Sequence, residues 1–229
     1  MGRSRVCKRR GDFRAGLAVR MNFDRLARHY DWLEALTAGG RLDRARTVWL
    51  GALERRKHVL SVGEGHGRFA GAFVKRFPFT QLTCVEGSRL MLERAQRRTS
   101  DALTPIQWIH SDFLRWAPQE KYDALVTCFF LDCFPPATLA ETIASLAACA
   151  TPDAVWLIVD FSVPAHGFAR WRATLVHSLM YKFFRIVTAL PARRQTPPDD
   201  LLRAQGFQLE RRQEFEWGLI RADVWRRSG

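Results

Sequence analysis

The sequence predicts an α/β fold built on a mostly parallel sheet with helices on both faces. Five short apolar runs alternate with helical stretches through the first two thirds of the chain, a pattern typical of parallel strands joined by right-handed crossovers. The first run leads into a glycine-rich turn and then a helix. Two further strand-like runs, separated by a turn at Gly218, close the chain. We therefore expect seven strands, the last two forming an antiparallel hairpin at the edge of the sheet.

The size and charge of the chain favour one domain with a basic tail. A chain of 229 residues with 47% hydrophobic content can bury the core of a single domain. The net charge is +13, and the first twenty residues hold seven basic residues and one acidic residue. Residues 1–21 lack a periodic apolar face, so we expect a disordered tail there and the domain over residues 22–229. Met21 leaves a second explanation open, an upstream extension of the reading frame.

The domain is expected to open with a helical pair over residues 22–53. Apolar residues recur at helical spacing from Phe23 to Leu36, and Gly39-Gly40 interrupts the pattern before a second helix from Leu42 to Leu53.

The remaining elements follow from apolar runs and helical periodicity. Strands are expected at residues 58–63, 81–86, 105–110, 121–130, 153–161, 207–217 and 219–225, and helices at 67–77, 88–98, 136–150 and from Pro197-Pro198 onward. The fourth and fifth runs are continuously apolar, as expected for central strands that are covered on both faces. Residues 163–195 form a helical insertion rich in aromatic and basic residues.

The glycine-rich turn is the strongest functional feature of the sequence. Gly63, Gly65 and Gly67 let the backbone turn sharply and approach a ligand, and the following helix offers free N–H groups to anionic groups. Glu86 closes the second run about 20 positions later, where nucleoside-binding folds place an acceptor for ribose hydroxyls. A dinucleotide fingerprint would require its third glycine at Arg68, so this spacing disfavours a nicotinamide dehydrogenase.

On these residues the chain resembles the class I S-adenosylmethionine-dependent methyltransferases, from Phe23 to the C-terminus. The matching features are the alternate glycines, the carboxylate that closes the second run, and Ser111-Asp112-Phe113 after the third run. The resemblance implies a Rossmann-like fold and S-adenosyl-L-methionine as the cofactor. One residue departs from the family pattern, because Ser61 stands where members usually carry an acidic residue.

The resemblance also implies a set of cofactor contacts. The glycine turn would flank the amino-acid end of the cofactor, Glu86 would accept both ribose hydroxyl protons, and Asp112 would lie near the adenine amino group with Phe113 beside the ring. For Asp112, capping of a helix is the alternative. The full expected set is Tyr30, Gly63, Glu64, Gly65, Gly67, Glu86, Gly87, Asp112, Phe113 and Phe129.

Tyr30 lies in a segment, Phe23 to Asp31, that resembles the opening of the ubiquinone/menaquinone C-methyltransferase group. The resemblance implies that this segment covers the cofactor, and an aromatic face suits a positive sulfonium. The alternative is an amphipathic helix that packs Tyr30 against the sheet.

Two residues are candidates for the catalytic base that methyl transfer sometimes requires. Asp132 follows the fourth run and could orient the substrate or take a proton, with capping of the next helix as the alternative. His166 follows the fifth run in a loop near the expected substrate crevice, with a surface loop histidine as the alternative. The segment Phe134-Pro135-Pro136-Ala137 lacks the polar and aromatic ends found in enzymes that methylate base amines.

These observations predict a methyltransferase acting on a small apolar molecule of lipid or quinone type. The aromatic and basic insertion could cover an apolar substrate, lie on a membrane interface as a peripheral contact, or pack on the core. A nucleic-acid methyltransferase and a cofactor-binding protein without turnover remain as alternatives.

The setting follows from the cysteines and from the length of the apolar runs. The five cysteines form no Cys-x-x-Cys pair, so we expect no metal and a reduced, cytoplasmic protein. We also expect neither a secretory signal nor a membrane span. The sequence leaves the oligomeric state open.

Overall fold

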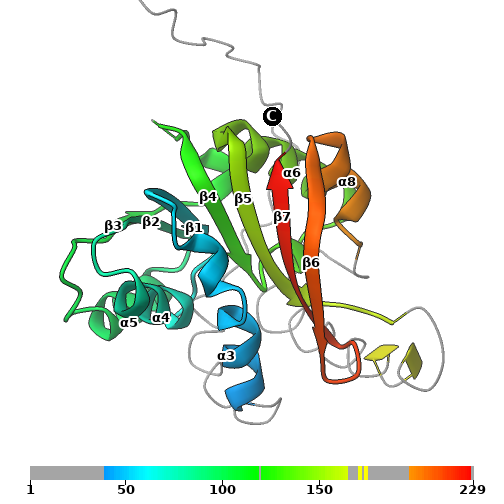
Figure 1. Ribbon diagram of the computed structural model, residues 1–229, viewed down its shortest axis with the longest axis horizontal. Coiled ribbons are helices and arrows are strands. Elements are labelled where there is room, and N and C mark those ends of the chain that lie inside the picture. Colours follow the sequence, from blue (N-terminus) through cyan, green and yellow to red (C-terminus); the bar gives the residue numbers. More distant parts are fainter. Residues whose placement is uncertain (1–38, 119, 165–169, 172, 175–195, 228–229) are drawn as a thin grey trace, which may run out of the picture.

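One seven-stranded sheet organises the chain (Figure 1). The computed structural model describes residues 39–118, 120–164, 170–171, 173–174 and 196–227. The strands are β1 (His58–Val62), β2 (Gln81–Glu86), β3 (Gln107–His110), β4 (Tyr122–Cys128), β5 (Ala150–Phe161), β6 (Phe207–Phe215) and β7 (Ile220–Arg227). The α-helices are α3 (Gly39–Thr47), α4 (Arg68–Arg76), α5 (Arg89–Arg98), α6 (Pro136–Cys149) and α8 (Asp199–Ala204). Three short 3-10 helices are η1 (Leu50–Leu53), η2 (Phe113–Arg115) and η3 (Leu131–Cys133).

The strand order is β3-β2-β1-β4-β5-β7-β6, with β1 to β5 parallel. Strand β7 runs antiparallel between β5 and β6, so the hairpin predicted at the C-terminal edge of the sheet is confirmed. The chain order reverses at β1, which lies between β2 and β4. Parallel sheets bind ligands at the carboxyl ends of the strands on either side of such a reversal.

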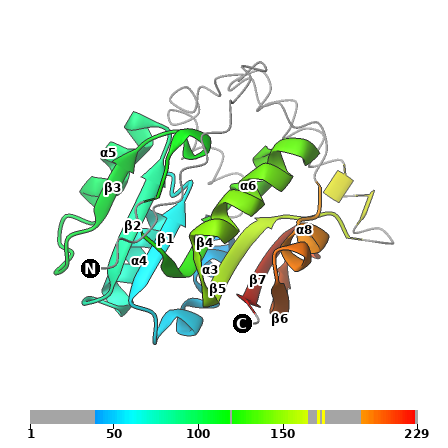
Figure 2. The same cartoon turned by 90° about the horizontal axis from the view of Figure 1, so that it is seen from above.

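Helices cover both faces of the sheet (Figure 2). Helices α6 and α8 pack on one face, against Trp156 of β5 and Trp225 of β7, both fully buried. Helix α4 covers the other face through Phe69 and Phe73, and α3 extends that layer over β5 and β7. The two layers bury the central strands on both sides, as their continuous apolar character predicts.

Several element boundaries differ from those that the sequence predicts. The expected helix 42–53 begins earlier, at Gly39, and ends at Thr47, after which the indole N–H of Trp49 donates to the Ala222 carbonyl at 3.0 Å. Strand β4 ends at Cys128 instead of residue 130, because Phe129 has a positive φ of 54° that breaks the extended chain. Strand β5 begins at Ala150, which pairs with Tyr122 of β4, and extra residues in β5 shift the register before Ala124 pairs with Val155.

An ion-pair network joins α8 to the C-terminal hairpin. Asp223 of β7 has a fully buried carboxylate that contacts Arg212 at 2.9 Å and Arg221 at 3.0 Å. The same two arginines contact Asp199 at 2.6 and 2.8 Å. Alternating charges satisfy the buried carboxylate, which would otherwise carry a large desolvation cost.

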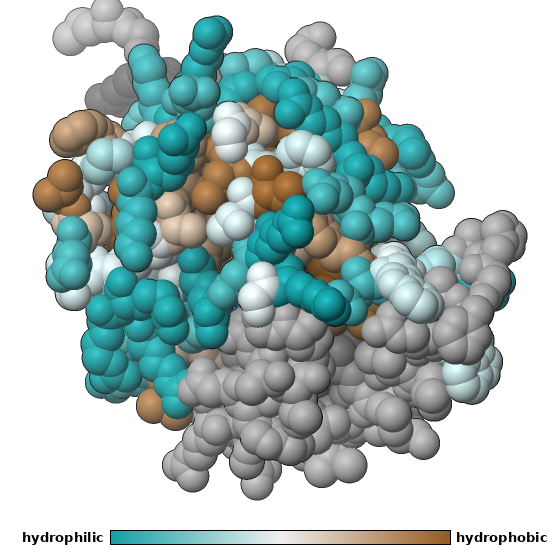
Figure 3. All heavy atoms as spheres, turned by 60° about the horizontal axis from the view of Figure 1, so that its bottom comes forward, coloured by the Kyte–Doolittle hydropathy of each residue, from teal (hydrophilic) through white to brown (hydrophobic). Residues whose placement is uncertain are grey.

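The tail at residues 1–21, the opening part of the expected helical pair at 22–38, and most of the 163–195 insertion lie outside the described residues. Within the described part of the chain, no helix is both long and apolar enough to cross a bilayer. On the face shown in Figure 3, the described apolar side chains form small patches among hydrophilic ones.

Candidate functional site

The glycine turn after β1 and the carboxylate that ends β2 are in direct contact. The backbone N–H of Gly65 donates to Oε2 of Glu86 at 2.8 Å. Oε1 of Glu86 accepts from the N–H of Ser88 at 2.8 Å, and the side chain is only 6% exposed. Burial raises the pKa of this carboxyl, although the backbone donors lower it. The two features that the sequence predicts to act together therefore form one site at the carboxyl ends of β1 and β2.

The three glycines of the turn are required for different reasons. All three have positive φ, between 63° and 83°. A Cβ atom on Gly63 would lie 2.4 Å from Cδ2 of Phe130, and one on Gly67 would lie 2.6 Å from Cα of Ala95. A Cβ atom on Gly65 would meet no described atom within 4 Å. Packing within the protein therefore requires two of the glycines, whereas Gly65 presents its backbone to open space.

A buried carboxyl group lies beside Ser61, where the family usually carries an acidic residue. The Ser61 hydroxyl donates to Oε2 of Glu64 at 2.6 Å, and the N–H of Ala70 donates to Oε1 at 2.8 Å. Burial raises the pKa of Glu64 to about 7, against the opposing effect of these hydrogen bonds and of Arg46. Glu64, itself a residue of the glycine turn, thus places an ionisable carboxyl group beside the start of α4.

The residues after β3 lie next to the Glu86 end of β2. Glu86 pairs with His110 in the parallel ladder, and the His110 ring contacts the Gly87 carbonyl at 3.2 Å. Oδ1 of Asp112 accepts from the N–H of Leu114 at 3.1 Å. Asp112 therefore caps the N-terminus of η2, which is the alternative role considered for it from the sequence. Its side chain is 57% exposed, which leaves the second oxygen accessible.

Phenylalanine rings gather where β4 and β5 end. The ring centroid of Phe129 lies 5.0 Å from that of Phe161, and the ring of Phe130 lies 5.0 Å from that of Phe134 and 6.2 Å from that of Phe113. Phe129, Phe130 and Phe161 are half-buried, whereas the other two rings are buried. This cluster gives an apolar character to the end of the sheet beside the glycine turn.

Asp132, one of the two candidate bases, is buried in η3 at the same end of the sheet. Burial raises its pKa to about 6. Pro135 is the N-terminal cap of α6, and the Asp132 carboxylate accepts a hydrogen bond from the backbone of Phe161. The other candidate, His166, and the expected cofactor residue Tyr30 lie outside the described residues.

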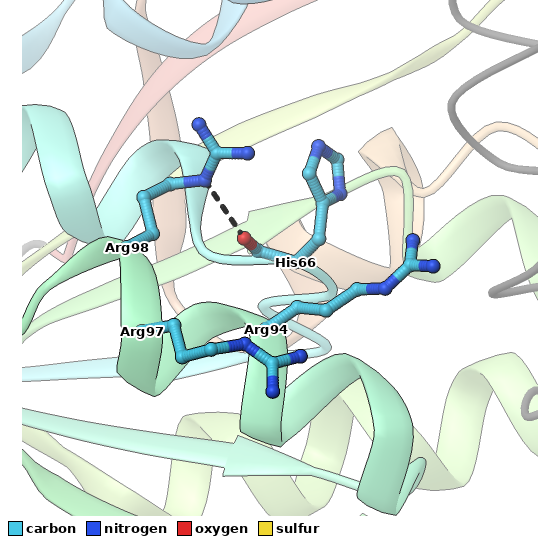
Figure 4. Close-up of a pocket in the computed structure, with 4 residues that line it drawn as sticks. All are labelled: His66, Arg94, Arg97 and Arg98. Atoms are coloured by element: carbon cyan, nitrogen blue, oxygen red, sulfur yellow. Dashed lines mark hydrogen bonds between the residues drawn. The ribbon is translucent and has the colours of Figure 1, made fainter.

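A basic hollow lies between the glycine turn and α5 (Figure 4). It measures about 360 Å³ and is lined by His66 and by Arg94, Arg97 and Arg98 of α5. Nε of Arg98 donates to the His66 carbonyl at 3.1 Å. The sequence interpretation missed this cluster, although the spacing of the three arginines along one helix could have indicated it.

Part of the chain is similar to known sequences. Residues 59–153 match the family described as methyltransferase domain. Trans-aconitate 2-methyltransferase from Acidovorax sp. (strain JS42) is 26% identical over 132 residues, covering 53% of this chain and 49% of that protein. Demethylmenaquinone methyltransferase from Chlamydia trachomatis serovar L2 is 31% identical over 101 residues, covering 44% and 43% respectively. The chain thus matches about half the length of these relatives.

Solved structures show the same fold. Mitomycin 7-O-methyltransferase gives a TM-score of 0.69 at 18% identity, covering 90% of this chain and 61% of that one. Magnesium protoporphyrin IX methyltransferase from Synechocystis PCC 6803, solved with bound SAH, gives 0.65 at 19% identity and covers 90% and 94%. The predicted fold is confirmed: the chain has the Rossmann-like fold of class I methyltransferases.

Replacing Glu64 by Gln should weaken the pH dependence of stability. The pKa of Glu64 in the folded protein, about 7, lies above the unfolded value of about 4.3. Folding therefore binds a proton, and stability is lost as pH rises through this window. Thermal melts should show a fall in Tm between about pH 5 and about pH 8 that is several degrees smaller in Glu64→Gln than in the parent protein. Exposed Glu54→Gln is the control, and equal falls in all three proteins would contradict the assignment.

Proposed function

We propose that this chain, which has the class I methyltransferase fold and matches a methyltransferase domain over residues 59–153, transfers the methyl group of S-adenosyl-L-methionine to a small apolar acceptor of lipid or quinone type. The observation that carries the proposal is the 2.8 Å contact between the Gly65 N–H and the Glu86 carboxylate. This contact places the exposed backbone of Gly65 beside Glu86, the proposed acceptor for the ribose hydroxyls. Both residues lie at the carboxyl ends of β1 and β2, where the strand order of the sheet reverses. Magnesium protoporphyrin IX methyltransferase, which shares the fold, was solved with bound SAM.

The described residues fit the parts of this cofactor. Glu86 would accept the ribose hydroxyls with the lone pairs that Gly65 and Ser88 leave free. Glu64, held by Ser61, would supply a buried carboxylate for the ammonium of the amino-acid end, in place of the family's usual acid. The adenine would lie between Gly87 and the Asp112-Phe113 segment, and Tyr30 would cover the ligand. When bound, the cofactor supplies an electrophilic methyl group on a positively charged sulfur.

The acceptor proposal is supported by the aromatic end of β4 and β5. Half-buried rings of Phe129, Phe130 and Phe161 favour a ligand with apolar surface. One relative carries the name demethylmenaquinone methyltransferase, and another the name trans-aconitate 2-methyltransferase. Asp132 and His166 are the proposed proton acceptors. Peripheral membrane contact is proposed through the 163–195 insertion, in which the described Trp171 is 62% exposed.

A second candidate, a nucleic-acid methyltransferase, is favoured by one observation, the basic hollow formed by His66 and three arginines. Guanidinium groups bind phosphates well. We rank this candidate second because the hollow lies on α5, away from the aromatic end of β4 and β5.

S-adenosylmethionine and S-adenosylhomocysteine should each raise the melting temperature, and NAD and NADP should not. Selective binding to the folded state at about 100 times Kd contributes about 2.7 kcal/mol, which corresponds to a rise of roughly 5 to 10 °C for a domain of this size. Differential scanning fluorimetry measures the shift. A larger rise with a nicotinamide nucleotide would reject the cofactor assignment.

Gly65→Ala should weaken the binding of S-adenosylmethionine at least about tenfold, by about 1.4 kcal/mol, because the new methyl group lies on the open side of the turn. Gly206→Ala is the matched control. Gly206 also has a positive φ, 83°, and a Cβ atom there would meet no described atom within 4 Å. Both variants should lose about 1–2 kcal/mol of stability through backbone strain. Equal cofactor affinity in the two variants, measured by titration calorimetry, would contradict the site.

An acceptor panel separates the candidate functions. We expect release of S-adenosylhomocysteine with 1,4-naphthohydroquinone, and none with trans-aconitate or total RNA. Methylation of RNA that falls steeply with salt would favour the second candidate. Cofactor binding without release for every acceptor would favour a binding protein that has lost turnover.

A further inference from the structure

Two aspartates connect the ends of β4 and β5 beyond the point where the strands stop pairing. The last backbone bond between them runs from the Phe129 N–H to the Val159 carbonyl. The next N–H, that of Phe130, donates to Oδ1 of Asp160 at 3.0 Å. In the opposite direction, the Asp132 carboxylate accepts a hydrogen bond from the backbone of Phe161. A carboxylate of each segment thus accepts a hydrogen bond from the main chain of the other segment.

Both carboxyl groups are buried, and one oxygen atom has no hydrogen-bond partner. Asp160 is 4% exposed and Asp132 is 9% exposed. Among the described residues, no donor reaches Oδ2 of Asp160. An isolated buried carboxylate oxygen costs several kcal/mol unless a proton or a donor satisfies it. This atom therefore requires a proton of its own or a ligand.

The charges around the pair are predominantly negative. Asp132 raises the pKa of Asp160 after burial itself, Asp223 of β7 raises it further, and Arg221 lowers it. Arg221 is already shared between Asp223 and Asp199. The thiols of Cys133 and Cys128 also face the pair, from η3 and β4. Arg212 and Arg221 already pair with Asp223 and Asp199 and do not compensate Asp132 and Asp160 as well, so the pair is expected to retain a proton.

We propose that Asp160 is a positioning residue for Asp132, and that the two carboxyl groups hold one proton between them at neutral pH. The proton lies on Oδ2 of Asp160, the atom without a partner, so Asp132 remains ionised beside the aromatic end of β4. Asp160 also holds the main chain of Phe130, whose ring packs against Gly63 of the cofactor turn. One group thus positions both the turn and the base.

The consequence for catalysis rests on the proposed function. When held by Glu64 and Glu86, the cofactor would supply its methyl carbon to an electron pair of the acceptor, and the electron pair of the broken sulfur–methyl bond would stay on sulfur as a neutral thioether. The proton that the acceptor loses passes to the Asp132 carboxylate. Because Asp160 retains its own proton throughout, it prevents a second negative charge from opposing the ionised form of Asp132.

Infrared difference spectroscopy of the ligand-free protein tests the proposal without an acceptor. A protonated carboxylic acid has a carbonyl band that shifts in D₂O. We expect Asp160→Asn to lose one such band at neutral pH while keeping the acceptor oxygen for the Phe130 N–H. Exposed Asp153→Asn is the matched control from the same strand and should leave the protonated-acid bands unchanged. An Asp160→Asn spectrum that keeps every protonated-acid band of the parent protein would overturn the proposal.

Asp132→Asn provides a second, independent readout. This change should keep the Asp160 band but shift its position, because the negative charge of Asp132 near the Asp160 acid is removed. An unshifted band would show that the two groups do not interact and would overturn the proposal. Retention of the band pattern together with no S-adenosylmethionine binding would instead reject the proposed function and leave the proton-sharing pair in place.

Discussion

The hydrogen bond between the Gly65 N–H and the Glu86 carboxylate is the interaction on which the site depends. It forms because β1 and β2 are adjacent parallel strands, so the turn after one and the residue ending the other meet at the same edge of the sheet. The carboxylate orients the turn, and the turn in return helps to satisfy a buried charge. The geometry of the proposed cofactor site thus follows from strand register.

Packing connects the glycine turn to the ends of β4 and β5. Phe130 lies against Gly63, where no side chain would fit, and its main chain is held by Asp160 of β5. The positive φ of the preceding Phe129 turns the chain away from the ladder and makes this placement available. The glycine turn, the aromatic cluster and the candidate base Asp132 are therefore connected by packing and hydrogen bonds.

Buried carboxyl groups are the second recurrent feature of this edge. Burial raises the pKa of each of four acids, Glu64, Glu86, Asp132 and Asp160. Such a concentration of acids reduces stability as pH rises and is typical of sites that bind cations or move protons. A ligand with an ammonium and a sulfonium group is chemically complementary to it.

The amino-acid sequence by itself determined the strand and helix order, the C-terminal hairpin, the glycine turn and the carboxylate ending β2. These are local patterns of hydrophobicity and spacing, so no long-range contact is needed to recognise them. Tertiary structure decided the rest. The partnership of Ser61 with Glu64, the separate reasons for the three glycines, the end of β4 at Cys128 and the burial of Asp132 and Asp160 beside one another's main chain all depend on atoms that are distant in sequence or on side-chain burial. Periodicity carries no information about which buried group faces which, because burial and charge proximity arise only when the sheet assembles.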